Sequence, residues 1–143
     1  MLIGLTGADG VGTVTAADHL CLQHRFTQFP LAELRAGWML ADDAVDPTKA
    51  AASLSQLLGD LADVDAVVTG VRFEIEASMI RERGGVIVRI EHPGAPRVIE
   101  HANEAGIRLH DDDRVLHNYG TFFHLYDQLD TLVNTLQFER AGA

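Results

Sequence analysis

The stretch Met1-Leu-Ile-Gly-Leu-Thr6 followed by Gly7-Ala-Asp-Gly-Val-Gly12 decides the fold of this chain. Its first six residues are a short apolar run of the kind that forms a buried strand. A glycine-rich loop follows at once, and residues 13–22 then read as a helix. A strand, a glycine loop and a helix in this order are the context that a phosphate-binding loop requires.

The glycine loop keeps the backbone spacing of the phosphate-binding pattern GxxxxGK[ST] but not its side chains. Gly7 and Gly12 have four residues between them, whereas Thr13 and Val14 occupy the places of the lysine and the hydroxyl residue. Backbone N–H groups and a helix N-terminus are enough to bind an anion. Phosphoryl transfer also needs the lysine charge and a hydroxyl that holds magnesium. The residues predicted here to bind phosphate are Gly7, Gly10, Gly12, Thr13 and Thr15. The alternative interpretation is a tight strand-to-helix turn without a ligand.

Length, net charge and cysteine content limit the number of domains, the partners and the location that can be expected for this protein. The 143 residues fit one domain, 1–143, with a sizeable core, and no stretch approaches the roughly 20 apolar residues that span a bilayer. The net charge of −10 argues against nucleic acid as a partner, because a phosphate polymer requires a basic surface. The single Cys21 excludes an internal disulfide and is expected in the core. Without a recognisable signal peptide, a cytoplasmic location is expected.

Hydrophobic periodicity predicts strands that alternate with helices. The expected strands are residues 1–6, 25–29, 65–69, 86–90 and 113–118. The expected helices are residues 12–23, a segment that begins at Pro30, residues 48–61, 74–83 and 122–136, and a short lid helix at 97–105 within a lid segment of about 92–112. This alternation predicts an α/β fold with a parallel sheet flanked by helices.

Four blocks in the same order carry a family resemblance. Residues 4–20 lie on the frame GLTGxxGxGKDTxAxxL, and residues 29–36 are similar to FADPLKxxLRA. Residues 70–94 follow DVRFxNEAxxIRxxGGxVxRIxRPG, and residues 101–104 are similar to HxSE. On these blocks the chain resembles the phage-type deoxynucleoside monophosphate kinase family, within the P-loop kinases that also include dephospho-CoA kinase. The resemblance implies a three-layer P-loop kinase-like fold with a small lid, and a phage origin.

The departures from the family pattern all concern phosphate and metal handling. Thr13 replaces the loop lysine, Val14 replaces the acidic or hydroxyl residue beside it, and Gly70 replaces the aspartate of the second strand motif. The stretch between Leu31 and Asp65 is also short, so a truncated monophosphate pocket is expected. No catalytic residue and no metal ligand is assigned on this basis.

Several family positions survive, and each has a structural alternative. The resemblance places Arg72 beside the phosphates and Arg97 in the lid, which completes the predicted phosphate site. The alternative role of Arg72 is to cap a helix or to form an ion pair with a nearby glutamate. The alternative for Arg89 is that its side chain simply lies on the exposed face of a strand. His101 and Glu104 fit a surface pair. The acidic run His110-Asp-Asp-Asp113 fits a solvated loop better than a cation site.

Three functions compete on this evidence. The favoured one is a degenerate deoxynucleoside monophosphate kinase-like protein that binds a nucleotide or a protein partner without efficient phosphoryl transfer. The second is an active deoxynucleoside monophosphate kinase in which Arg72 or Arg97 replaces the loop lysine. The third is an acidic interaction or inhibitor protein on a kinase scaffold. ATP or another nucleotide is the candidate cofactor, Mg²⁺ and a membrane partner are not expected, and a homodimer stays open.

Overall fold

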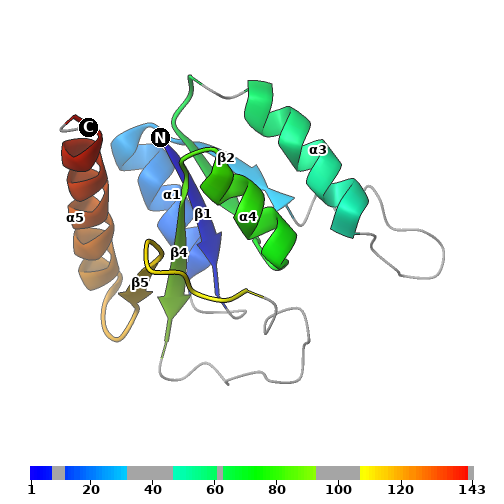
Figure 1. The fold of residues 1–143 in the computed structure, drawn as a ribbon. Helices are drawn as coiled ribbons and strands as arrows, with labels where there is room; N and C mark the ends of the chain where they lie inside the picture. Colours follow the sequence, from blue (N-terminus) through cyan, green and yellow to red (C-terminus); the bar gives the residue numbers. More distant parts are fainter. Residues whose placement is uncertain (8–11, 32–46, 61–62, 93–106, 142–143) are drawn as a thin grey trace.

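The computed structural model describes residues 1–7, 12–31, 47–60, 63–92 and 107–141. Strands and helices alternate along these residues, as the sequence predicts (Figure 1). The strands are β1 (Leu2–Thr6), β2 (Thr27–Pro30), β3 (Ala66–Thr69), β4 (Val86–Glu91) and β5 (Arg114–His117). The helices are α1 (Thr13–His24), α3 (Pro47–Asp60), α4 (Glu74–Glu82) and α5 (Phe122–Ala141).

The five strands form one sheet in the order β2-β3-β1-β4-β5, and every neighbouring pair is parallel. β1 lies at the centre, where Gly4 pairs with Val68 of β3 on one edge and with Ile87 of β4 on the other. Parallel neighbours require crossover connections, and the helices supply them. The predicted α/β class with a central parallel sheet is confirmed.

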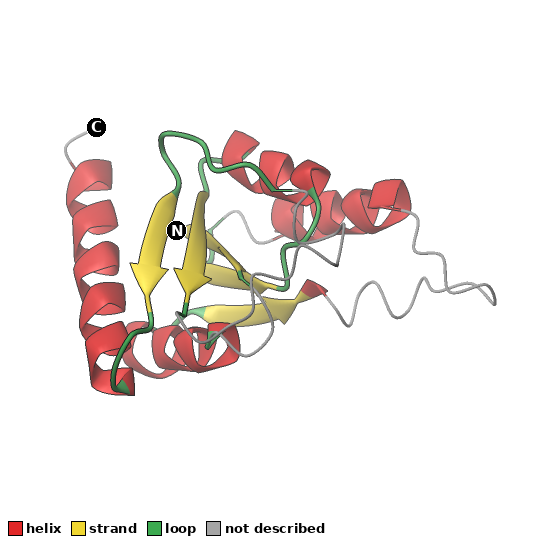
Figure 2. Cartoon of the chain, turned by 90° about the horizontal axis from the view of Figure 1, so that it is seen from below, coloured by secondary structure: helices red, strands yellow, loops and turns green. Residues whose placement is uncertain are grey.

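Helices cover both faces of the sheet, so the protein has three layers (Figures 1 and 2). On one face α1 and α5 pack over a core that includes Ile3, Leu20 and Leu129. On the other face α3 and α4 pack over a second core that includes Leu54 and Ile80. The three inner strands β1, β3 and β4 direct alternate residues to the two cores, which explains why β1 and β3 are apolar up to their final threonine. Cys21 is only partly buried at the edge of the first core, where burial and the charge of Asp18 raise the pKa of its thiol.

Two expectations at prolines are wrong. Pro30, predicted to start a helix, is the last residue of β2, where it pairs with Thr69. Proline is tolerated there because β2 is an edge strand and needs no N–H on its outer side. Pro47, which the sequence leaves just outside the helix expected at residues 48–61, is the first residue of α3, a position that suits its fixed φ angle.

Two further sequence expectations concern the lid and the membrane. The lid helix at 97–105 and most of the lid segment lie outside the described residues. Among the residues that are described, no helix is both long and apolar enough to cross a membrane.

The acidic run at residues 110–113 is not a simple solvated loop. Asp111 and Asp112 are exposed, but the side chain of Asp113 is 2% exposed and accepts hydrogen bonds from Arg81 at 2.6 and 3.1 Å. Arg81 also donates to Glu74 at 2.9 Å. Burial raises the pKa of Asp113, but the Arg81 hydrogen bonds, the His110 N–H and the Arg81 charge outweigh it and hold that pKa below its usual value. The network therefore ties α4 to the segment that enters β5.

Arg81→Ala should destabilise the fold by about 3 kcal/mol, because it leaves the buried Asp113 carboxylate without the positive charge that Arg81 supplies. Arg83→Ala is the matched control, since its exposed guanidinium donates to Ser55 among the described residues, and it should cost less than about 1 kcal/mol. Urea unfolding at pH 7 measures both. Equal costs for the two variants would contradict the assignment.

The same network predicts a dependence of stability on pH. The pKa of Asp113 is lower in the folded state than in the unfolded state, so the unfolded chain binds the proton more readily. The stabilisation is complete above the ordinary carboxyl pKa of about 3.9 and is lost as the pH falls through the folded-state pKa. Urea unfolding from pH 7 down to pH 3 should show this loss in the parent chain and a smaller one in Arg81→Ala.

Candidate functional site

The candidate site lies at the carboxyl edge of the sheet, where the chain leaves the central strand. Thr6, the last residue of β1, is buried and donates from its hydroxyl to the carbonyl of Val71 at 2.8 Å. The N–H of Val71 donates to the carbonyl of Leu5 at 3.3 Å. These two hydrogen bonds connect the end of β1 to the residues that follow β3, in addition to the pairing of the two strands. They hold in place the end of β1, from which the chain continues into Gly7. Ligands of open α/β sheets bind at this edge.

Gly12 is the N-cap residue of helix α1, and its backbone geometry requires glycine. Its φ of +103° is in the left-handed region, and a Cβ there would lie 2.8 Å from Nδ2 of Asn118. The carbonyl of Gly12 accepts the first helical hydrogen bond, from Ala16, at 2.9 Å. Because glycine has no side chain with which to cap the helix, it leaves the first-turn N–H groups of α1 to other acceptors.

A pocket of about 400 Å³ opens at this helix start. The first turn of α1 forms one wall, and the ends of β4 and β5 with the turn into α5 form the rest. Its lining residues are Gly12, Thr13, Val14, Thr15, His92, Asn118, Gly120 and Phe122. The N–H of Asn118 donates to the carbonyl of Glu91 at 2.7 Å, which extends the pairing of β4 and β5 and fixes this wall. A volume of this size is within the range of small-molecule sites.

The structure brings three of the seven predicted site residues together. Gly12, Thr13 and Thr15 line the pocket, and Gly7 directly follows β1. Arg72 belongs to the same edge of the sheet but does not line this pocket. Gly10 and Arg97 lie outside the described residues.

Glu76 organises the start of α4 next to Arg72. Its fully buried carboxylate accepts hydrogen bonds at 3.1 Å from the backbone N–H groups of Arg72 and Phe73. This is the glutamate half of a capping box, and it holds the backbone between β3 and α4. The side chain of Arg72 is exposed at this point. The backbone of Arg72 therefore takes part in capping α4, and helix capping is one of the alternative roles considered for Arg72 from the sequence.

Arg89 has a structural contact of its own. Its guanidinium donates to the carbonyl of Ile107 at 3.0 Å, and Ile107 is buried in the core beneath α3 and α4. The side chain is partly buried and does not lie on an open strand face, which was its alternative in the sequence. It holds the segment that follows residue 106 against the sheet.

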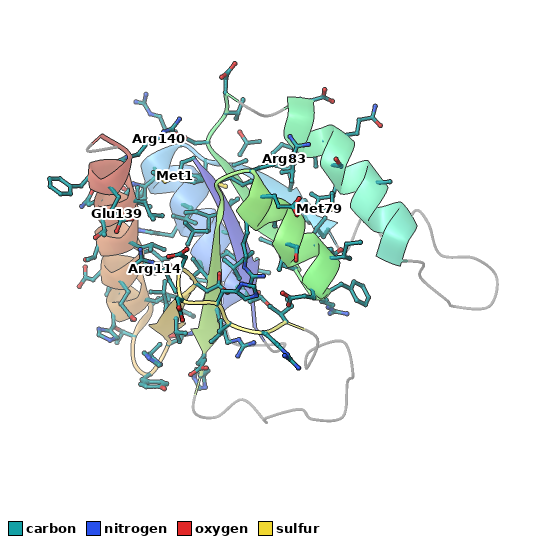
Figure 3. All side chains as sticks on the ribbon, viewed as in Figure 1. Met1, Met79, Arg83, Arg114, Glu139 and Arg140 are labelled. Carbon is teal, nitrogen blue, oxygen red and sulfur yellow. The ribbon has the colours of Figure 1, made fainter. Side chains whose placement is uncertain are left out.

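A larger pocket, of about 670 Å³, lies at the opposite edge of the sheet, where the strands begin. Met1, Arg83 and Arg140 gather there (Figure 3). Sites in parallel α/β sheets form at the carboxyl ends of the strands, so the pocket at Gly12 is the candidate despite its smaller volume.

Sequence reasoning missed His92, Asn118 and Phe122 as pocket residues. Asn118 and His92 each follow directly after a strand, and the carboxyl ends of parallel strands converge on one edge. The position directly after a strand could therefore have identified both as candidate site residues. Nothing in the sequence marks Phe122 in this way, because it is the first apolar residue of an expected helix. In the structure it is 54% exposed at the pocket.

Comparison with known proteins identifies a viral sequence relative. No protein-family model matches the chain. A putative deoxynucleotide monophosphate kinase of Acanthamoeba polyphaga mimivirus is 35% identical over 69 residues. That match covers 48% of this chain and 36% of the viral protein, so the chain spans about a third of that relative's length.

Solved structures show the fold over almost the whole chain. An unliganded sugar kinase from a Janibacter species has a TM-score of 0.64, with 94% of this chain and 92% of that chain covered. Shikimate kinase from Aquifex aeolicus has a TM-score of 0.60 over 100% of both chains. A gluconokinase from Sinorhizobium meliloti also scores 0.60, over 96% of this chain and 95% of that one. Each is 15% identical to this chain, a level that shows the fold alone: the chain shares the α/β fold of these three kinases.

Gly12→Ala should lower stability by about 1–2 kcal/mol, because alanine is strained at this φ and its Cβ would meet Asn118. Gly120→Ala is the matched control on the other wall of the pocket, since its Cβ would have no atom within 4 Å, and it should be nearly neutral. Thermal unfolding of both variants measures the difference. A neutral Gly12→Ala would show that the left-handed start of α1 is not required.

Proposed function

We propose that this chain is a degenerate relative of the deoxynucleoside monophosphate kinases that binds a nucleotide through backbone groups at its glycine loop, without efficient phosphoryl transfer. The protein would act by binding, with the nucleotide or a protein partner as its ligand. The chemistry of the pocket, the residues at the reactive positions and the viral relative support this proposal.

The observation that carries the proposal is the chemistry of the pocket wall. The described residues that line the pocket include neither lysine nor arginine, and neither aspartate nor glutamate. What they offer an anion is the start of α1, with the backbone N–H groups of Thr13 to Thr15 and two threonine hydroxyls. A helix start of this kind binds phosphate by its N–H groups and partial positive charge.

The groups that accelerate phosphoryl transfer are replaced. Val14 is 63% exposed at the position where a hydroxyl would hold magnesium, and a valine offers a metal no ligand atom. Gly70, at the end of β3, has no carboxylate to assist. Losses of this kind cost on the order of a thousandfold or more in rate, because preorganised charge is the main source of catalysis in such sites.

The remaining wall suits a nucleoside better than a bare phosphate. Phe122 offers an exposed aromatic ring, on which a base can stack. The viral relative, described as a deoxynucleotide monophosphate kinase, supports a nucleotide as the ligand class.

Nucleotide binding should raise the thermal midpoint by several degrees, since a ligand at ~100 times its dissociation constant adds roughly 2.7 kcal/mol. The measurement is thermal unfolding with ribo- and deoxynucleoside mono-, di- and triphosphates, each with and without magnesium. Pyrophosphate is the control for binding of a bare anion. A magnesium-independent shift supports the proposal, whereas a magnesium-dependent shift with product formation would favour the active kinase. If no nucleotide shifts the thermal midpoint, the proposal is overturned, and the remaining hypothesis is an acidic interaction protein on a kinase scaffold.

Thr13→Lys should strengthen triphosphate binding by about tenfold or more, because one charge-assisted hydrogen bond contributes about 1.5–3 kcal/mol. Thr13→Gln, a long polar side chain without the charge, should not do so. Calorimetric titration of both variants with ATP measures the effect. No gain in the lysine variant would mean that the phosphates do not lie at the start of α1.

The lysine variant should still transfer phosphate poorly, because Gly70 supplies no carboxylate. Adding Gly70→Asp tests this directly in a coupled phosphoryl-transfer assay. Gly70 has a φ of +76°, where aspartate costs about 1 kcal/mol, so the double variant should be less stable but remain folded.

A further inference from the structure

Three side chains from the two helices of the first core converge on one point. His19 and His24 come from α1, and Asp130 comes from α5, more than 100 residues away in the sequence. Nε2 of His19 lies 2.8 Å from Oδ1 of Asp130, and Nε2 of His24 lies 2.7 Å from the same oxygen. The three atoms all lie within 4.8 Å of one another. One carboxylate oxygen therefore faces the edges of two imidazole rings.

Neighbouring rings hold the imidazoles in place. Tyr126, one turn before Asp130 on α5, stacks on His19 with ring centroids 4.2 Å apart and planes 6° from parallel. The ring of His24 meets His19 edge-on, with centroids 5.9 Å apart. Helix α5 thus presents a ring that orients His19 and a carboxylate that meets its Nε2. The side chains of His19 and His24 are 10% and 18% exposed, whereas Asp130 is 44% exposed, so solvent reaches the cluster from the Asp130 side.

We propose that His19, His24 and Asp130 form a binding site for a divalent first-row transition metal ion, with Zn²⁺ as the fitting probe. Two imidazole nitrogens and one carboxylate oxygen are a donor set that zinc prefers, and the open side leaves a fourth position for water. In a tetrahedral site with bonds of about 2.0–2.1 Å, ligand atoms stand roughly 3.3 Å apart. The ion needs a small outward movement of the exposed carboxylate, and it replaces the two hydrogen bonds with two metal bonds.

The site is separate from the phosphate pocket. Both involve α1, but the pocket is at Thr13 and the histidines occupy its second half, with His24 at the last position. Along the helix axis Thr13 is about 9 Å from His19, six positions on, and about 16 Å from His24, eleven positions on. α1 and α5 lie side by side on the same face of the sheet (Figures 1 and 2). A metal ion here links the two helices directly, so the expected role is to stabilise their packing.

The test is binding of Zn²⁺ to the chelator-treated, full-length chain, followed by calorimetry and thermal unfolding. One ion per chain should bind, and saturation should raise the thermal midpoint by several degrees. Co²⁺ used in its place should give the visible absorption of a four-coordinate site. Asp130→Asn keeps an oxygen that accepts from both rings but removes the charge, so it should fold normally and weaken Zn²⁺ binding by at least about tenfold.

Two control variants separate this site from other metal-binding side chains. His124→Ala removes an exposed histidine from α5, and Cys21→Ser removes the only thiol, and both should bind Zn²⁺ as the parent chain does. His24→Gln should weaken binding as Asp130→Asn does. The proposal is overturned if the parent chain binds no ion, or if binding persists unchanged in Asp130→Asn and His24→Gln. In those cases the cluster is a hydrogen-bonded contact between helices and nothing more.

Discussion

Crowding around the central strand β1 governs the geometry of the whole edge where the candidate site lies. The strand has partners on both sides, and on one face a Cβ at Gly4 would come within 2.8 Å of Ile87 and 2.9 Å of Ile80. On the other face Ile3 and Leu5 are fully buried. A strand enclosed in this way cannot shift without opening two cores, and close-packed interiors resist even small displacements. The glycine loop and the start of α1 therefore begin from a rigid support.

Such an edge separates two kinds of chemistry that active phosphotransferases combine. Recognition of an anion depends on backbone N–H groups, which the fold sets in place whatever the side chains are. Acceleration of transfer depends on a few charged side chains, which single substitutions remove. Thr13, Val14 and Gly70 supply no charged group of the second kind. Under the proposed function, a fold that keeps the anion-binding backbone without these charged groups is what selection for binding alone would leave.

The sequence predicted the elements well because each one is set by local pattern, but it failed where distant residues meet. All five strands and the described helices agree with the apolar periodicity. Pro30 was misassigned because only the sheet order shows that β2 is an edge. Asp113 was read as solvated because its partner, Arg81, is 32 residues away. The contact between Gly12 and Asn118 could not be foreseen in the same way, since it depends on how β5 lies beside the loop.

The two cores differ in when their parts leave the ribosome. The core beneath α3 and α4 is built from residues between Leu31 and Ile107. The other core depends on Leu125, Leu129 and Val133 of α5, which follow the other members of that core in the sequence. During synthesis the face of α1 and β1 that belongs to this core therefore stays uncovered until α5 emerges. At usual rates of about 5–20 residues per second the wait is several seconds, the period in which the nascent chain most needs protection from aggregation.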